Sequence, residues 1–297
     1  MHSTDINGAL YKGKSMTLSD VAILAVVQGL AELLPVSSSA HVIMAEKMLG
    51  LNPSAPDMTL LLVLLHTGTM FAVIVYFWRQ WLATYFSSGS AFRRNVWLII
   101  IATLATGITG GILLKLITHY YAANAPGFEI EQLFSNSKLI SAGLLAAGIL
   151  IILSARIKER QGGDMTSARA AVVGVVQGLC LPFRGFSRSG ATISTGLLVG
   201  MARSRAEEFS FALAVTLTPV VVAKEVYRVF SHQSGAGAVA SGSATSGLLL
   251  PSLLGMVLSF VVGLLALRWL SRWLEQDRWH LFGGYCIAAA ALVFWLG

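Results

Sequence analysis

The sequence consists largely of successive apolar runs, each close in length to a helix that crosses a lipid bilayer. Such a helix needs about 20 mostly apolar residues. Six segments approach that length, namely 58–78, 96–115, 138–155, 207–227, 247–270 and 280–297. Only 12% of the residues are charged and the mean hydropathy is +0.72, whereas about 25% are charged in an average soluble domain. The sequence therefore predicts an all-α integral membrane protein with six transmembrane helices, and excludes an ordinary soluble enzyme.

Two further apolar segments are interrupted by polar residues. Residues 19–50 contain PVSSSAH near their centre, and residues 168–202 contain FRGFSRSG. Backbone that leaves the helical conformation at membrane depth is tolerated only where protein or a water-filled cavity covers it. We therefore expect two re-entrant helical hairpins, each with two short arms that meet at a polar tip.

The two predicted hairpins share an internal repeat. The sequence VVQGL occurs at 26–30 and again at 175–179, followed each time by a proline and a group of serines. Each copy would comprise a hairpin and three spans, and because three crossings change sides, the second copy is expected to be inverted. Inverted repeats place broken helices near the membrane midplane. The predicted organisation is a polar segment 1–18, repeat A over 19–155, a cytoplasmic linker over 156–167 and repeat B over 168–297.

The basic residues predict the orientation of the chain in the membrane. In this arrangement twelve lie on one side: Arg79, Arg93, Arg94, Arg156, Lys158, Arg160, Arg169, Arg203, Arg205, Arg268, Arg272 and Arg278. Seven lie on the other: Lys12, Lys14, Lys47, Lys115, Lys138, Lys224 and Arg228. Because cytoplasmic loops carry the excess of Lys and Arg, both termini are expected outside. No stretch interleaves basic and aromatic residues on a polar surface, so we expect no nucleic-acid partner.

The first hairpin holds a group of residues that could carry out chemistry. Ionisable groups in apolar segments are costly to insert into a membrane, which favours a functional role. Gln28 and Glu32 are four residues apart and share a helix face. The arm that carries them leads to three hydroxyls and an imidazole, those of Ser37, Ser38, Ser39 and His41. The first tip thus combines a carboxylate, candidate nucleophiles and a candidate proton carrier.

The second hairpin has the composition of an anion site. Two guanidinium groups, those of Arg184 and Arg188, flank a flexible loop, and a guanidinium presents a fork of donors suited to phosphate. The amides at the start of the following helical arm would add further donors. The hydroxyls and the glycine expected to contact phosphate belong to Ser187, Ser189, Thr192 and Gly185. On the first tip, Ser37 and Ser39 are expected to contact phosphate as well.

If the two tips face each other, they supply a nucleophile, an acid or base and an anion clamp, as phosphoryl transfer requires. Two alternatives remain open from the residues alone. Glu32 could be a structural partner of Arg188, and the inverted repeat is equally the architecture of a transporter or lipid flippase. His66 lies within a predicted span, where a helix–helix hydrogen bond is the favoured interpretation.

These motifs resemble those of the undecaprenyl pyrophosphate phosphatase (BacA) family. QGLAELLPVSSSAH is similar to the family's [E/Q]xxxE and PVSS-x-x-H region, and RGFSRSGAT is similar to its PGxSRSxxT motif. The similarity continues through LLHTGTMFAVIVYFW and EEFSFALAV, and it covers the chain from about residue 18 to the end.

The resemblance implies a hydrolase of the bacterial inner membrane that removes the terminal phosphate of undecaprenyl diphosphate, recycles the lipid carrier of the cell wall and confers bacitracin resistance when abundant. It implies a divalent cation, magnesium or calcium, as cofactor. It also implies that the protein is surrounded by membrane lipid, that the active site faces the periplasm, and that a homodimer is possible. By position, Glu32 matches the motif acid, Ser38 the nucleophile, His41 the motif histidine and Arg188 the phosphate-binding arginine. Gln28 and Glu32 are the expected metal ligands.

The sequence departs from the family pattern at two positions. Gln28 occupies the first acid position, and an amide is a weaker magnesium ligand than a carboxylate. Arg184 replaces the motif proline. A rival family, the type 2 phosphatidic acid phosphatases, is excluded because its distal histidine position is occupied here by Ser194 and no aspartate follows. The sequence thus favours a site built from Ser38, Glu32 and Arg188 over one with a histidine nucleophile.

Overall fold

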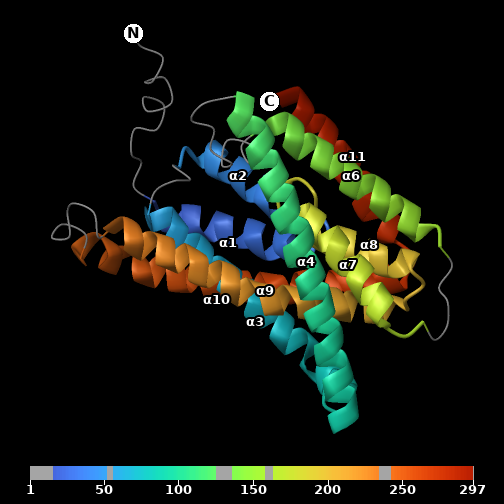
Figure 1. Ribbon diagram of the computed structural model, residues 1–297. Coiled ribbons are helices and arrows are strands. Elements are labelled where there is room, and N and C mark those ends of the chain that lie inside the picture. Colours follow the sequence, from blue (N-terminus) through green and yellow to red (C-terminus); the bar gives the residue numbers. More distant parts are fainter. Residues whose placement is uncertain (1–15, 52–55, 125–135, 158–162, 234–241, 297) are drawn as a thin grey trace.

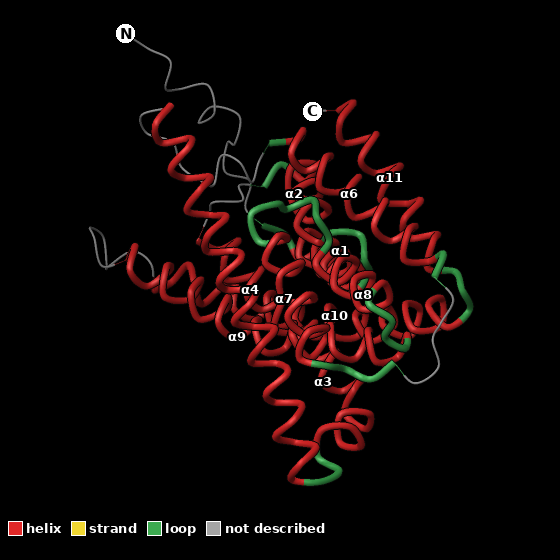
Figure 2. The backbone as a smooth tube through the Cα atoms, turned by 45° about the vertical axis from the view of Figure 1, so that its right-hand side comes forward, coloured by secondary structure: helices red, strands yellow, loops and turns green. Residues whose placement is uncertain are grey.

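The computed structural model describes residues 16–51, 56–124, 136–157, 163–233 and 242–296. Within them the chain folds into ten helices and no strand, joined by short loops (Figures 1 and 2). The helices are α1 (Leu18–Leu33), α2 (Ser38–Leu49), α3 (Pro56–Tyr85), α4 (Gly89–Asn124), α6 (Ser137–Ala155), α7 (Ser167–Cys180), α8 (Arg188–Leu198), α9 (Arg203–Gln233), α10 (Gly242–Glu275) and α11 (Trp279–Leu296). The predicted all-α class is confirmed. Most of the polar segment 1–18, part of the linker 156–167 and residue 297 lie outside the described residues.

Four described helices are long and apolar enough to cross a membrane. They are Met58–Tyr85, Gly89–Tyr120, Ser137–Ala155 and Leu249–Glu275, within α3, α4, α6 and α10. The described part of α11 is apolar but shorter, and α9, which begins with charged residues, is not among the four. The fold is therefore that of a helical membrane protein, while the predicted number of six spans remains a prediction.

Both predicted hairpins contain the expected break in the helix. α1 ends at Leu33 and α2 begins at Ser38, while α7 ends at Cys180 and α8 begins at Arg188. Prolines follow each first arm, at Pro35 and Pro182, where a ring without an N–H group ends a helix. The helix–break–helix prediction is confirmed at both places.

The glycines of the two VVQGL copies lie at close helix crossings. A Cβ on Gly29 of α1 would come within 2.9 Å of the Val262 side chain of α10. A Cβ on Gly178 of α7 would come 2.8 Å from the carbonyl oxygen of Thr106 on α4. Small residues allow helix backbones to approach closely in membranes, where packing and not hydrophobicity drives association. The first arm of each hairpin is thereby held against a long helix from the other half of the chain.

The largest apolar core cluster joins helices from both halves of the chain. It includes Leu33 of α1, Phe77 of α3, Ile193 of α8, Phe211 of α9 and Leu267 of α10, each at most 2% exposed. The rings of Phe77 and Phe211 stack with centroids 5.4 Å apart. This cluster supports the broken helices from behind.

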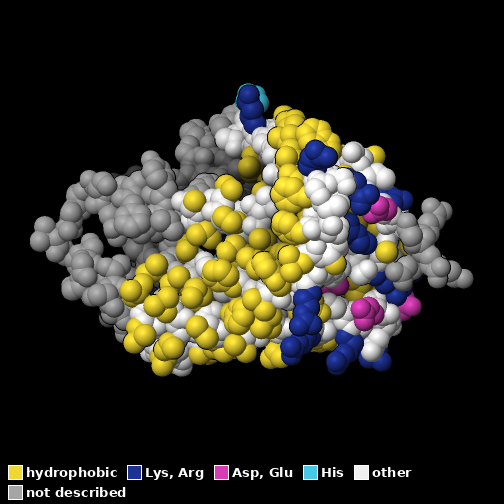
Figure 3. All heavy atoms as spheres, turned by 90° about the horizontal axis from the view of Figure 1, so that it is seen from below, with side chains coloured by type: hydrophobic (Ala, Val, Ile, Leu, Met, Phe, Trp, Pro, Cys, Tyr) yellow, Lys and Arg dark blue, Asp and Glu magenta, His cyan; other side chains and the backbone are white. Residues whose placement is uncertain are grey.

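The outer surface is apolar over most of one visible face and basic at one end. Figure 3 shows hydrophobic side chains over most of the described part of that face, with Lys and Arg gathered towards one side. On α4 an exposed apolar stripe includes Trp97, Leu104, Ile108 and Ile112. Large exposed apolar areas of this kind are typical of a surface that contacts lipid.

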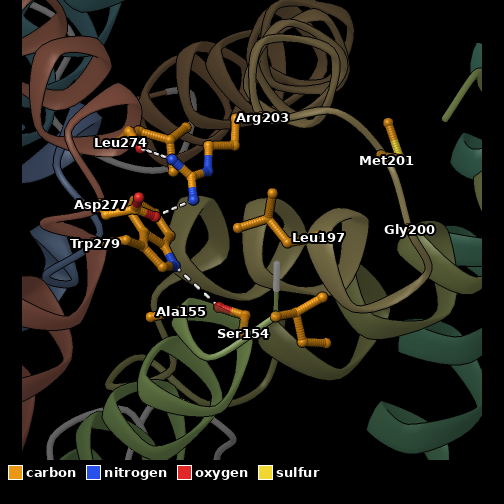
Figure 4. Close-up of a pocket in the computed structure, with 10 residues that line it drawn as sticks. Ser154, Ala155, Leu197, Gly200, Met201, Arg203, Leu274, Asp277 and Trp279 are labelled. Carbon is orange, nitrogen blue, oxygen red and sulfur yellow. Dashed lines mark hydrogen bonds and ion pairs between the residues drawn. The ribbon is translucent and has the colours of Figure 1, made fainter. Parts of the chain in front are cut away.

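Loops at the basic end are joined to one another by polar contacts. Arg203 at the start of α9 donates to the Leu274 carbonyl at the end of α10 over 3.2 Å and pairs with Asp277 (Figure 4). The Trp279 indole donates over 3.0 Å to Ser154 at the end of α6. These groups border a small void of about 20 Å³, so the α6, α9 and α10 ends form one compact corner.

Candidate active site

The two helix breaks meet through hydrogen bonds to a main-chain carbonyl. The hydroxyls of Ser37 and Ser39 both donate to the carbonyl oxygen of Arg184, Ser39 over 2.7 Å. Ser189 of α8 donates to the Leu34 carbonyl over 3.3 Å. Because α2 and α8 both begin at this junction, the positive ends of two helix dipoles converge there, which favours a bound anion.

Ser37 shows how tightly the first tip is bent. Its φ of 69° lies in the left-handed region, which costs a residue with a side chain about 1 kcal/mol or more. The surrounding hydrogen bonds hold it there: its hydroxyl bonds Arg184, and its carbonyl accepts from the His41 side chain over 2.8 Å. The bend presents the next residue, Ser38, at the first turn of α2.

Glu32 is the centre of the polar network. Its Oε2 accepts a hydrogen bond of 2.6 Å from the Ser38 hydroxyl and one of 3.2 Å from Gln28 Nε2. Its Oε1 accepts a bond of 2.8 Å from Arg188 Nη2. The side chains of Glu32 and Arg188 are 15% and 24% exposed, so little water screens their attraction. The predicted nucleophile, acid and clamp therefore form one connected cluster.

A cavity of about 710 Å³ opens beside this cluster. Eight of the predicted site residues line it together with Arg184: Gln28, Glu32, Ser37, Ser38, Ser39, Ser187, Arg188 and Ser189. Its other walls include apolar residues of α3 and α9, such as Leu62, Val63 and Leu217. Arg188 Nη1 is buried here with no hydrogen-bond partner among the described residues. A polar end with unpaired donors and an apolar wall would suit a lipid with an anionic headgroup.

Two predicted phosphate ligands lie elsewhere. Gly185 packs against the backbone of Ile140 on α6, where a side chain would collide. Thr192 is 1% exposed, donates to the Arg188 carbonyl over 2.8 Å and contacts the Ser210 hydroxyl at 2.6 Å. Neither lines the cavity. Both residues shape the Arg188 loop from behind, and direct phosphate contact by them stays a prediction.

Ser187 and Ser189 line the cavity but also have structural bonds. The Ser187 hydroxyl accepts from the Gly190 amide over 3.2 Å and so caps α8. It lies 3.4 Å from the Ser189 hydroxyl. A capping hydroxyl can still donate its own proton, so a phosphate contact by these serines stays a prediction.

His41 faces away from the cavity. Its Nδ1 lies 2.8 Å from the Ser37 carbonyl and its Nε2 lies 2.6 Å from the Tyr285 hydroxyl of α11. A carbonyl only accepts, so Nδ1 must carry a proton. Both nitrogens are thus occupied, and neither contacts Ser38 or Glu32. His41 thus lies where its hydrogen bonds hold the bent tip. Its partner Tyr285 is too far away in the sequence to have been predicted.

His66 and Glu46 also line the cavity, and neither is among the site residues predicted from the sequence. His66 of α3 donates from Nδ1 to the Leu62 carbonyl over 2.8 Å, and its Nε2 lies 3.7 Å from Glu32 Oε2. Glu46 of α2 is 1% exposed. His66 was visible in the sequence as a polar residue within an apolar span, whereas Glu46 sits in a short amphipathic arm and gave no such signal.

The predicted divalent cation can be tested against the donors present. No group of three or more His, Cys, Asp or Glu side chains in the described ranges could hold a metal ion. Gln28, however, is a fully buried residue of the cavity lining, and its Oε1 has no hydrogen-bond donor among the described residues. Amide and carboxylate oxygens are ligands for magnesium and calcium. Gln28 and Glu32 could therefore supply part of a coordination shell, which phosphate oxygens would have to complete.

Comparisons with known proteins place the chain in a family. The profile of the family described as bacitracin resistance protein BacA matches residues 21–292. The chain is 60% identical to undecaprenyl-diphosphatase 2 of Acinetobacter baylyi over 95% of this chain and 99% of that protein. It is 32% identical to undecaprenyl-diphosphatase of Rhodopirellula baltica over 92% of this chain and 95% of that protein. The chain therefore belongs to the bacitracin resistance protein BacA family.

Proposed function

We propose that this protein is an undecaprenyl-diphosphatase, a membrane hydrolase that converts undecaprenyl diphosphate to the monophosphate. The observation that carries the proposal is the bonding of Ser38 and Arg188 to the same carboxylate, that of Glu32, beside a cavity with an apolar wall. Relatives with this name match nearly the whole chain. A carrier would need binding groups but no hydroxyl held against a carboxylate, so a lipid flippase is not favoured.

In the proposed reaction Ser38 attacks the terminal phosphorus. The bond between that phosphorus and the bridging oxygen breaks, and undecaprenyl phosphate leaves. Glu32 takes the hydroxyl proton, since it already accepts the Ser38 hydrogen bond over 2.6 Å. Arg188 binds the equatorial oxygens through its unpaired Nη1. Water then hydrolyses the phosphoserine to release inorganic phosphate.

The alternative step is direct attack by water, with Glu32 as the base. Under either version, His41 acts on the reaction by holding the Ser37–Ser38 bend rather than by touching substrate. A divalent cation, magnesium or calcium, would neutralise phosphate charge when bound. Gln28 and Glu32 are the residues that would hold it.

The membrane arrangement we propose has six spans and two re-entrant hairpins in an inverted repeat. The support is the equivalence of contacts between the two halves. The arm α1 of the first half packs on α10, the fourth helix of the second half, and α7 packs on α4, the fourth helix of the first. In both pairs the glycine of VVQGL makes the close approach. The predicted repeats are 19–155 and 168–297.

We further propose that the active site faces the outside of a bacterial inner membrane, as both termini do. The loops that carry most arginines contact one another at one end. Arg94 of α4 bonds Asp164 before α7 over 3.1 Å, Gly163 lies against Gly200 before α9, and Arg203 bonds the end of α10. A single basic side is expected to be cytoplasmic.

Thiol labelling tests this orientation. In a background of Cys180→Ala and Cys286→Ala, Met48→Cys, at a position 82% exposed near the end of α2, should react with a membrane-impermeant maleimide added to intact cells. Arg93→Cys, exposed at the start of α4, should react only after permeabilisation. The reverse pattern would place the Ser38 tip on the cytoplasmic side.

Phosphate release tests the function itself. The purified protein in detergent, with magnesium or calcium, should release one inorganic phosphate per undecaprenyl diphosphate and leave the monophosphate. No gradient exists in detergent, so transport cannot contribute to the signal. Binding of the lipid without phosphate release, under either cation, would support the carrier instead.

A further inference from the structure

A second acidic and basic pair lines the active-site cavity, and the reaction above does not use it. Glu46 of α2 is 1% exposed, and its Oε1 has no hydrogen-bond partner among the described residues. Arg184 also lines the cavity, and its positive charge attracts the Glu46 carboxylate. A buried carboxylate oxygen without a donor lowers the stability of a fold. The pair therefore needs an explanation other than stability.

The backbone around Arg184 is fixed from two sides. Its carbonyl accepts the hydroxyls of Ser37 and Ser39, the neighbours of the nucleophile. The next residue, Gly185, lies directly against the Ile140 backbone of α6. The Arg184 side chain thus starts from a backbone that is held in place, and it lines the cavity.

The two cavity arginines differ in depth. Arg188 is bonded to Glu32, and its side chain is 24% exposed. Arg184 is exposed and precedes the first turn of α8. In a lipid diphosphate the terminal phosphate must reach Ser38, while the other phosphate remains attached to the chain and lies nearer the cavity mouth. The order of the arginines matches the order of the phosphates.

Resting on the proposed function, we infer that Arg184, positioned by Glu46, binds the phosphate that stays on the lipid and makes the site prefer diphosphates to monophosphates. A guanidinium has five N–H donors in a planar fork, so Arg184 can bond the Glu46 carboxylate and a phosphate together. The monophosphate product would have one guanidinium contact fewer than the substrate. The same contact that selects the substrate therefore favours release of the product.

The test measures binding, which does not depend on turnover. Isothermal titration calorimetry of the purified protein would compare methylenediphosphonate, a diphosphate analogue that resists hydrolysis, with orthophosphate. The wild type should bind the analogue at least about tenfold more tightly, which corresponds to ~1.4 kcal/mol. Arg184→Gln should lower the affinity for the analogue about tenfold and leave the affinity for orthophosphate within about twofold of the wild-type value. Arg93→Gln, an exposed arginine of α4 outside the cavity, should change neither.

A second variant separates substrate binding from a structural tie. Arg184→Gln alone leaves the Glu46 charge without its counter-charge, so Arg184→Gln with Glu46→Gln keeps the site neutral. The double variant should melt close to the wild type and still lack the preference. Equal affinity of the wild type for both probes, or parallel weakening of both in the variants, would overturn the inference.

The two proposals can fail separately. If the wild type prefers the diphosphate analogue but releases no phosphate from undecaprenyl diphosphate, the proposed function is wrong while Arg184 remains a diphosphate contact. In an active enzyme, Arg184→Gln should raise KM for the lipid about tenfold and keep kcat within about threefold. A large loss of kcat with unchanged KM would instead assign Arg184 to the chemical step.

Discussion

Arg188→Lys is expected to lower kcat/KM by about 10²-fold or more, and Arg188→Ala by about 10³-fold or more. Lysine retains the charge but loses the planar fork, and here one branch of that fork bonds Glu32 Oε1 over 2.8 Å while Nη1 remains for phosphate. One ammonium cannot reproduce both contacts. An arginine on a transferred phosphoryl group contributes about 10³–10⁵ in rate. Phosphate release from purified protein, normalised to the amount of folded protein, measures the effect.

Arg94→Lys is the matched control for this prediction. Arg94 also pairs with a carboxylate, that of Asp164, but both side chains are 56% exposed. Exposed ion pairs contribute little to stability, so this variant should retain activity within about twofold. If Arg188→Lys were as active as Arg94→Lys, Arg188 would act only by charge neutralisation.

Ser38→Ala should reduce kcat by at least about 10³-fold, the scale seen when a nucleophile is removed. Ser38 is the hydroxyl that donates to Glu32 Oε2. Ser39→Ala is its adjacent control, because that hydroxyl bonds the Arg184 carbonyl instead. Losing one such hydrogen bond costs about 1 kcal/mol, so Ser39→Ala should lose less than about tenfold. Turnover at saturating substrate gives both values.

The result for Ser38→Ala also decides between the two proposed steps. A phosphoserine route requires the hydroxyl, whereas attack by water requires only the base. If Ser38→Ala kept more than about a tenth of the wild-type kcat, with Ser39→Ala similar, water would be the nucleophile and Glu32 its base. The hydrolase proposal would survive that result, and the covalent step would not.

The sequence predicted the polar cluster around Glu32 because its signal is chemical and local. Glu32, Ser38 and Arg188 stand out as polar groups within apolar segments, and the structure joins them by hydrogen bonds. The breaks in both hairpins followed equally from composition and proline positions. Those features depend on neighbours in the chain, which a single sequence displays directly.

The parts that sequence reasoning missed depend on distant partners. His41 is held by Tyr285, which lies 244 residues further along the chain, so its role next to Ser38 could not be judged from spacing. Gly185 follows the motif pattern but faces Ile140. Glu46 becomes notable only because Arg184 and the cavity lie beside it. The direction of a side chain at a bent tip depends on packing against distant residues. The hydrophobic periodicity of the sequence does not predict that packing.

The contact between α1 and α10 has a consequence for biosynthesis. Gly29 of the first arm packs against Val262, which is made near the end of translation. Until α8 is synthesised, the carboxylate of Glu32 lacks Arg188. Until α10 enters the membrane, the first arm lacks its main packing partner. The nascent chain must therefore keep a polar tip in a provisional, water-accessible position while most of the protein is still being synthesised. Packing around the Glu32 tip is then completed in one of the last steps of membrane insertion, when α10 closes on the first arm.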